Sequence, residues 1–270
     1  DGNWLPYEQF KMEDSNRKNK QQQSNEKYMI YTSNGWSKIN RVIRHKTTKK
    51  IYRVTTHSSV VDVTEDHSLL DDNLNILKPT EIDTNTQLLH NYPQFNINRN
   101  QIHLSDILDY KIEDKDINIK KAYIYGFFYG DGSCGYYKCP SGNKYSWALN
   151  NSDSDLIIIL QSLLYEVYNE EFTINDTLKS SGVYKLVPTK NVRKYVNEYR
   201  NIFYNKDKYK IIPKDILNED YETKYSFLCG YYCADGYKCK NSKSKNIILT
   251  NKGKIGTSML NYLAKSIGFN

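Results

Sequence analysis

The segment "SFLCGYYCADGY" (residues 226–237) repeats the segment "AYIYGFFYGDGS" (residues 122–133) of the same chain. Each copy is typical of a buried helix that ends in an aspartate followed by a glycine. The C-terminal end of a helix carries partial negative charge from its unpaired carbonyls, so a carboxylate is disfavoured there. Asp131 and Asp235 therefore require a compensating interaction.

Small residues recur in both copies at a four-residue spacing, which places them on one face of a helix. Such a face lets two helices approach backbone against backbone. If the helices pack side by side and run in the same direction, their two terminal aspartates lie close together. We expect a glycine in a left-handed conformation to close each helix, at Gly132 and Gly236. The residues predicted at the helix interface are Gly126, Gly130, Gly230 and Ala234.

Two carboxylates and two negative helix ends in one small volume are unfavourable unless a divalent cation lies between them. Mg²⁺ prefers carboxylate and water oxygens and is commonly held by one or two carboxylates plus phosphate. The repeat therefore predicts a Mg²⁺ site formed by Asp131 and Asp235 for phosphodiester chemistry. For one copy alone, an Asp-Gly helix exit with a tight turn and no metal is the better explanation; the duplication favours the metal site.

The doubled segments "IYGFFYGDG" (residues 124–132) and "LCGYYCADG" (residues 228–236) resemble the two LAGLIDADG motifs of homing endonucleases. The resemblance covers roughly residues 119–270. It implies two αββαββα-type halves, residues 119–220 and a truncated 221–270, whose sheets lie in the DNA major groove. It also implies that Asp131 and Asp235 are catalytic and hold Mg²⁺ above the scissile phosphates.

The resemblance further implies a basic catalytic residue near the centre of the site. Lys210 in "DKYKIIPKDIL" (residues 207–217) fits best, because intein-borne members have a lysine shortly before a proline ahead of the second motif. Its role would be to polarise the attacking water or to offset phosphate charge. The alternative is that Lys210 is one of many surface lysines.

The charge balance permits a nucleic-acid partner without proving one, since 38 Lys+Arg against 31 Asp+Glu give a formal charge of +7. On strands or hairpins after the motifs, lysines would contact phosphates and tyrosines could reach base edges. A solvated strand face is the alternative. The tyrosines are Tyr136, Tyr137, Tyr145 and Tyr184. The predicted DNA-binding lysines are Lys138, Lys144, Lys185, Lys238, Lys240, Lys243 and Lys245.

The region before the repeat has a different pattern. Residues 11–27 are polar and without periodicity, which predicts a solvated loop or disorder. From Tyr28 to His90, short alternating runs broken by turn residues predict strands. We therefore assign residues 1–95 to a small all-β domain and residues 96–118 to a connector. The predicted fold class is α+β.

The segment "VVDVTEDHSLL" (residues 60–70) places Thr64 and His67 in a Thr-x-x-His arrangement at a strand end. Together with residues 35–59 before it and the doubled motifs after it, this segment resembles the N-terminal splicing region of an intein. In such proteins a Hint-type β fold carries a nested LAGLIDADG endonuclease. The amino-acid sequence is similar to that of inteins in B-family DNA polymerases of large DNA viruses.

The intein resemblance implies an N-to-S or N-to-O acyl shift at the upstream junction. His67 would donate a hydrogen bond to the scissile amide, Thr64 would orient or stabilise the intermediate, and Asp66 would be a secondary contributor. The chain begins Asp1-Gly2 rather than with a nucleophilic Cys or Ser, and it does not end in His-Asn. We therefore expect these 270 residues not to splice without their flanks.

The remaining expectations concern partners and compartment. Five cysteines without CxxC spacing favour reduced thiols in an intracellular setting over zinc ligation. No apolar run approaches the roughly 20 residues of a membrane span. Expected partners are double-stranded DNA of the intein-free allele and a host protein, in the form of a DNA polymerase, for a monomer with pseudo-twofold symmetry. The rivals are a freestanding homing endonuclease and a non-cleaving, maturase-like binder of DNA or RNA; both aspartates argue for cleavage.

Overall fold

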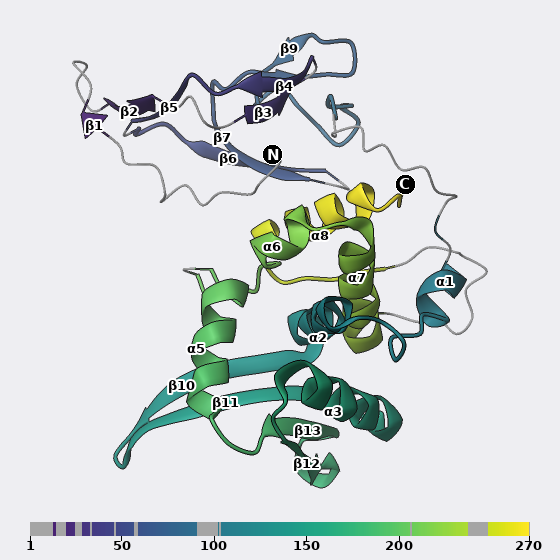
Figure 1. The fold of residues 1–270 in the computed structure, drawn as a ribbon. Coiled ribbons are helices and arrows are strands. Elements are labelled where there is room, and N and C mark those ends of the chain that lie inside the picture. Colours follow the sequence, from purple (N-terminus) through teal and green to yellow (C-terminus); the bar gives the residue numbers. More distant parts are fainter. Residues whose placement is uncertain are drawn as a thin grey trace. The chain divides into compact units, whose positions relative to one another are not determined.

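The structure is a computed structural model that describes residues 13–14, 20–24, 29–32, 34–45, 47–56, 59–90, 102, 104–205, 207–236 and 248–269. The chain divides into two compact units, residues 1–96 and 97–270. Figure 1 shows strands alone in the labelled part of the first unit and a mixture of helices and strands in the second. In these ranges, no helix has the length and apolar character needed to cross a bilayer.

The first unit consists of strands and turns in its described part, without a helix. All pairs are antiparallel, in a three-stranded sheet β1-β2-β5 and three two-stranded sheets, β3-β4, β6-β7 and β8-β9. These small sheets show an all-β unit but do not by themselves define a Hint fold. The strands are β1 Glu13–Asp14, β2 Lys20–Ser24, β3 Met29–Thr32, β4 Gly35–Lys38, β5 Arg41–His45, β6 Ile51–Thr55, β7 Val60–Thr64, β8 Leu69–Leu70 and β9 Ile76–Leu77.

The prediction of a loop over residues 11–27 is wrong in part, because β1 and β2 lie within it. Strand β2 has the sequence "KQQQS" and pairs with β1 on one side and β5 on the other. Main-chain hydrogen bonds between strands do not depend on apolar alternation, so hydrophobic periodicity cannot detect such a strand.

The second unit has the order α-β-β-α-β-β-α from α2 to α5, with the one-turn helix α4 inserted between β12 and β13. Helices α7 and α8 belong to the second copy of the repeat, and residues 237–247 between them lie outside the described ranges. The elements are α1 Leu104–Leu108, α2 Ile117–Asp131, β10 Gly132–Cys139, β11 Gly142–Asn151, α3 Ser154–Tyr168, β12 Phe172–Thr177, α4 Leu178–Ser181, β13 Val183–Pro188, α5 Val192–Phe203, α6 Lys214–Asn218, α7 Tyr221–Asp235 and α8 Lys254–Ser266.

The predicted connector, residues 96–118, contains helix α1 and the first residues of α2. Helix α2 begins where it does because the Asp116 side chain accepts hydrogen bonds from the main-chain N–H groups of Asn118 and Ile119. A carboxylate at this position satisfies otherwise unpaired donors and interacts favourably with the helix dipole.

The four-stranded antiparallel sheet of this unit has the order β10-β11-β13-β12, and helices α2, α3 and α5 cover one of its faces (Figure 1). Alternation along the strands turns Trp147, Leu149 and Leu186 toward the helices, where all three are buried. The Trp147 ring lies 5.7 Å from the Phe128 ring of α2 and 5.2 Å from the Tyr199 ring of α5. This aromatic core fixes α2 and α5 on the sheet, and no helix of the described residues covers the opposite face.

Candidate functional site

Helices α2 and α7 pack side by side and run in the same direction. Near their beginnings, the Ser226 hydroxyl donates to the carbonyl oxygen of Ile119 at 2.8 Å. Further along, a Cβ atom on Gly126 would overlap the carbonyl oxygen of Phe227, and a Cβ on Gly230 would overlap that of Tyr123. Any larger side chain at either glycine would push the two backbones apart.

The same contact continues to the C-terminal ends of the two helices. A Cβ atom on Gly130 would lie 2.7 Å from the Cβ of Ala234 and 3.1 Å from the Cβ of Asp235. Asp131 and Asp235 are the last residues of α2 and α7. The structure therefore brings the two carboxylates to the same end of the helix pair, and all four residues predicted for the interface lie in it.

Burial perturbs the pKa of both carboxylates, and the charge of Asp235 perturbs that of Asp131 further. Burial, and then the charge of Asp235, raise the pKa of Asp131 to about 6, although a hydrogen bond from Asn151 and the charge of Lys210 act in the opposite direction. Burial also raises the pKa of Asp235, and Lys210 partly offsets this. A pair of carboxylates that resists ionisation is stabilised by an added cation.

The expectation of left-handed helix caps is wrong. Gly132 has φ −79° and ψ 153°, and Gly236 has φ −74° and ψ 129°, so both are extended. A Cβ on Gly132 would overlap the Phe128 ring, and one on Gly236 would overlap the carbonyl oxygen of Tyr232. Glycine is needed at these positions for close approach to the last helical turn, and at Gly132 the chain leaves the helix directly into β10.

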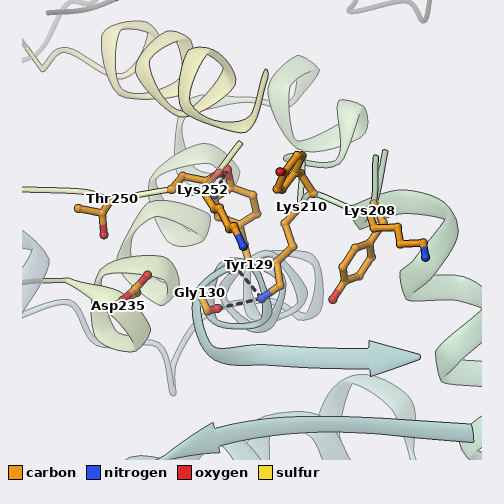
Figure 2. Close-up of a pocket in the computed structure, with 10 residues that line it drawn as sticks. Tyr129, Gly130, Lys208, Lys210, Asp235, Thr250 and Lys252 are labelled. Atoms are coloured by element: carbon orange, nitrogen blue, oxygen red, sulfur yellow. Dashed lines mark hydrogen bonds between the residues drawn. The ribbon is translucent and has the colours of Figure 1, made fainter. Parts of the chain in front are cut away.

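Lys210 reaches the C-terminal end of α2 (Figure 2). Its ammonium lies within hydrogen-bond distance of the carbonyl oxygens of Phe128 (2.9 Å), Tyr129 (3.1 Å), Gly130 (2.8 Å) and Gly132 (2.6 Å). A cation at this position offsets the negative end of the helix dipole. Burial lowers the pKa of Lys210 to about 8, while the nearby charges of Asp131, Cys134 and Asp235 act to raise it.

A tight turn after α5 delivers Lys210 to this position. Tyr204 and Lys210 form an antiparallel bridge, and the Ile211 N–H donates to the carbonyl oxygen of Phe203 at 2.7 Å. Within the turn, the Asn205 side chain accepts from the Tyr209 N–H at 2.9 Å. Lys208 adopts a left-handed conformation with φ 64°, which a non-glycine residue rarely does.

A pocket of about 430 Å³ opens between this turn and the end of α7 (Figure 2). It combines three lysines with one carboxylate. Lys208 and Lys252 are absent from the predicted site, since only the tertiary structure brings them beside Asp235. The lining residues are Tyr129, Gly130, Tyr204, Lys208, Tyr209, Lys210, Asp235, Thr250, Asn251 and Lys252.

Two asparagines at equivalent places make the two halves of the site unequal. The side-chain oxygens of Asn151 and Asn251 each accept from a main-chain N–H two residues later, at 3.0 Å and 2.9 Å. The Asn151 amide then donates to Asp131 Oδ2 at 3.1 Å, whereas the Asn251 amide donates to the Tyr129 hydroxyl at 2.7 Å. Neither asparagine is among the predicted site residues, because only the fold brings their amides to these partners.

The donor set at the helix ends fits Mg²⁺ better than zinc. Within the ranges that the structure describes, no basic side chain lies within 4.0 Å of either carboxylate, and no cluster of three His, Cys, Asp or Glu residues is present. Two carboxylates leave room for water and phosphate oxygens, the ligand set that Mg²⁺ takes in nucleotide chemistry. The described cysteines are free thiols, and Cys239 lies outside the described residues.

The strand register divides the predicted DNA-binding residues between two faces of the sheet. Tyr137 pairs with Lys144, and Lys185 pairs with Asn150. Alternation from buried Trp147 places these positions on the face without helices. The other predicted residues of these strands, Lys138, Tyr136, Tyr145 and Tyr184, fall on the helix side. Lys238, Lys240, Lys243 and Lys245 lie outside the described residues.

In the first unit, the structure places the predicted splicing residues at the end of β7. The His67 N–H donates to the carbonyl oxygen of Thr64 at 3.0 Å, and the His67 side chain is exposed. The Asp66 carboxylate forms an ion pair with Lys49. Hydrogen bonds from Lys49 and then Thr64 lower the pKa of Asp66. Lys49, from the turn before β6, was not predicted as a partner.

No family model matches the chain. The chain is 49% identical over 270 residues to a protein named DNA polymerase from Acanthamoeba polyphaga mimivirus, in an alignment that covers 99% of this chain and 15% of that protein. A DNA polymerase of Thermococcus aggregans is 47% identical over 51 residues, which are 18% of this chain and 3% of that protein. The chain thus spans a small part of the length of these relatives.

Among solved structures, a variant of I-DmoI in complex with its target DNA in the presence of Mn matches with a TM-score of 0.39 and 19% identity, over 56% of this chain and 75% of that chain. Mesophilic variants of the homing endonuclease I-DmoI match with a TM-score of 0.33 and 19% identity, over 46% of this chain and 64% of that chain.

Proposed function

We propose that this chain is part of an intein with a LAGLIDADG homing endonuclease that cuts double-stranded DNA with Mg²⁺. One observation carries the nuclease assignment. Asp131 and Asp235 are the last residues of two helices that pack closely through glycines, so both carboxylates lie at the same end of the helix pair, and burial raises the pKa of each. Without a cation this arrangement is unfavourable. A bound Mg²⁺ would supply the missing positive charge and could at the same time bind an oxygen of the DNA phosphate.

Each residue of the site has a role in this proposal. Asp131 and Asp235 hold the Mg²⁺, which when bound activates water and stabilises the leaving oxygen. Asn151 fixes the Asp131 carboxylate by donating to its Oδ2 atom. Lys210 supplies positive charge next to the carboxylates, since its pKa of about 8 leaves most of it protonated at pH 7. Lys144 and Lys185 contact DNA phosphates from the open face of the sheet.

The proposed host is a DNA polymerase. The relatives named DNA polymerase come from Acanthamoeba polyphaga mimivirus and from Thermococcus aggregans, and the matched regions are 15% and 3% of their lengths. A module that occupies a small part of much longer polymerases is what an inserted intein would look like. Thr64, His67 and Asp66 are the proposed splicing residues, with His67 as donor to the scissile amide.

Cleavage of a supercoiled plasmid that carries the uninterrupted polymerase allele tests the nuclease. We expect cutting with Mg²⁺, no cutting with a chelator, and a loss of about 100-fold or more in Asp131→Asn and Asp235→Asn. Asp114→Asn, at an exposed carboxylate before α2, is the matched control. Equal rates for wild type and Asp131→Asn would overturn the metal assignment. Specific binding without any cutting would favour a non-cleaving relative.

Splicing is tested separately, with the native flanking segments restored and the ligated host protein detected by mass. We expect His67→Ala to block the first step and Ser68→Ala, at the exposed neighbouring position, to leave it intact. Cleavage of DNA without any ligated host protein would identify a freestanding endonuclease instead.

A further inference from the structure

The guanidinium of Arg200, in the last turn of α5, contacts two aromatic rings that belong to different elements. It lies 5.8 Å from the centre of the Tyr136 ring on β10 and 5.1 Å from the centre of the Tyr204 ring, directly after α5. Both distances are within the range of cation–π attraction. Arg200 therefore joins the β10–β11 hairpin to the turn that follows α5.

The Tyr204 end of this contact leads to Lys210. Tyr204 and Lys210 face each other across the antiparallel bridge, and both line the pocket beside Asp235. The Asn205 N–H donates to the carbonyl oxygen of Tyr209 at 3.0 Å, which closes the turn between them. A displacement of Tyr204 would therefore move the main chain from which Lys210 reaches the end of α2.

On its other side, the Arg200 contact reaches Tyr136, a residue of the hairpin that also forms the open face of the sheet. Tyr136 pairs with Tyr145 across the hairpin, and the next pair, Tyr137 with Lys144, lies on the face proposed to contact DNA. A second arginine, Arg193, lies 5.4 Å from the centre of the Tyr145 ring. Figure 1 shows α5 lying across this hairpin. The two arginines thus brace the hairpin from the helix side.

We propose that Arg200 is a positioning residue that couples the β10–β11 hairpin to Lys210. This inference rests on the proposed nuclease function. DNA that fits the open face holds the hairpin in place, and Arg200, in cation–π contact with the Tyr136 and Tyr204 rings, transmits that placement to the turn carrying Lys210. Cleavage then depends on whether the hairpin fits its DNA, and not only on whether DNA is bound.

The chemistry of this contact favours arginine over lysine. A guanidinium is planar and stacks on aromatic rings, whereas a lysine ammonium is a strongly hydrated point charge that does not stack. Arg200→Lys therefore keeps the charge and should weaken the coupling, because a single ammonium cannot spread over both rings as a planar guanidinium does. By the usual strength of such contacts, we expect the single-turnover cleavage rate of this variant to fall about three- to tenfold, with DNA affinity in Ca²⁺ changed less than about twofold.

Matched variants separate coupling from a general structural role. Arg193→Lys alters only the contact between α5 and Tyr145 of the hairpin, so it should leave the cleavage rate of bound DNA close to that of wild type. Tyr136→Phe keeps the ring and should behave as wild type, whereas Tyr136→Leu should reproduce Arg200→Lys. In a Lys210→Met background, Arg200→Lys should cause no further loss, because the residue it positions is gone. A full additional loss in that background, or an effect of Arg200→Lys on affinity alone, would overturn the proposal.

A measurement without cleavage distinguishes failure of the coupling from failure of the nuclease assignment. Amide hydrogen exchange over residues 204–211 should be faster in Arg200→Lys than in wild type and unchanged in Arg193→Lys. If wild type does not cut DNA but this exchange pattern appears, the proposed function is wrong and the Arg200 contact is structural. If wild type cuts and the exchange of residues 204–211 is the same in all three proteins, the coupling is wrong.

Discussion

The Nζ atom of Lys210 donates a hydrogen bond to the carbonyl oxygen of Gly132 at 2.6 Å, which ties the turn after α5 to the junction of α2 with β10. The same ammonium reaches carbonyl oxygens of the last turn of α2. Lys210 thus supplies the cation that the end of α2 lacks within its own sequence, immediately beside Asp131.

Replacement of Lys210 should therefore destabilise the second unit. Lys210→Met leaves the carbonyl oxygens at the end of α2 without their donor, and we expect the free energy of unfolding to fall by about 1–3 kcal/mol in urea denaturation. The release of a buried ammonium opposes part of this loss. Lys208→Met, at the exposed lysine of the same turn, is the control and should change stability little. Equal stability of Lys210→Met and wild type would contradict the capping role.

The packing of α2 against α7 should tolerate no side chain at Gly230. A methyl group there would overlap the carbonyl oxygen of Tyr123, a main-chain atom that cannot rotate away. We expect Gly230→Ala to lower the free energy of unfolding by about 3 kcal/mol, despite the better helix propensity of alanine. Asn197→Ala, at an exposed position of α5, should be nearly neutral. A fully stable Gly230→Ala protein would mean that the helices are farther apart than the structure shows.

Removal of one carboxylate should stabilise the protein in the absence of metal. Asp131→Asn relieves the repulsion with Asp235 and keeps an oxygen that can accept from Asn151. After allowance for solvent screening we expect a gain of about 1 kcal/mol at pH 7, or roughly 2–4 °C in Tm. Addition of Mg²⁺ should raise the Tm of wild type but not that of the variant. A lower Tm for metal-free Asp131→Asn would contradict the repulsion.

The titration of Asp131 should make the free energy of unfolding depend on pH. Its pKa is about 6 in the folded chain against an ordinary value of 3.8, so between these values the native state binds more protons than the unfolded state. Stability of the metal-free protein should therefore fall as pH rises from about 4 to 6, and this slope should be smaller in Asp131→Asn. Mg²⁺ should bind more weakly below pH 6, where it competes with the proton. Calorimetry across this range, with and without Mg²⁺, measures both effects.

The salt dependence of DNA binding should show which face of the sheet contacts the DNA phosphates. Lys144→Ala and Lys185→Ala each remove one phosphate contact from the open face, so each should lower the slope of log K against log salt by about 0.9. Lys138→Ala, which alternation places on the helix side, should change the slope less. A larger effect at Lys138 than at Lys144 would show that DNA does not lie on the open face.

Particular elements show how far sequence reasoning reached. The four-residue spacing of small residues predicted a close pair of helices, and Gly126 and Gly230 lie where their backbones touch. Alternation predicted strands β6 and β7. By contrast, polar β2 could not be found from periodicity, because it is defined by its main-chain pairing with β5 and its own sequence has no apolar alternation. The conformation of Gly132 was mispredicted, since a helix that continues straight into a strand needs no left-handed turn.

The two helices, the small residues on their contacting faces and the aspartate at the end of each could be read from the amino-acid sequence, because they depend on residue types at short, fixed spacings. The surroundings of the aspartates follow from the folded arrangement: Lys210 donates to carbonyl oxygens of α2, Asn151 donates to Asp131, and Arg200 contacts the Tyr136 and Tyr204 rings. These contacts join residues that are far apart along the chain. Their geometry depends on strand register and helix packing. Both are set by how the whole core packs, so a short sequence pattern cannot predict them.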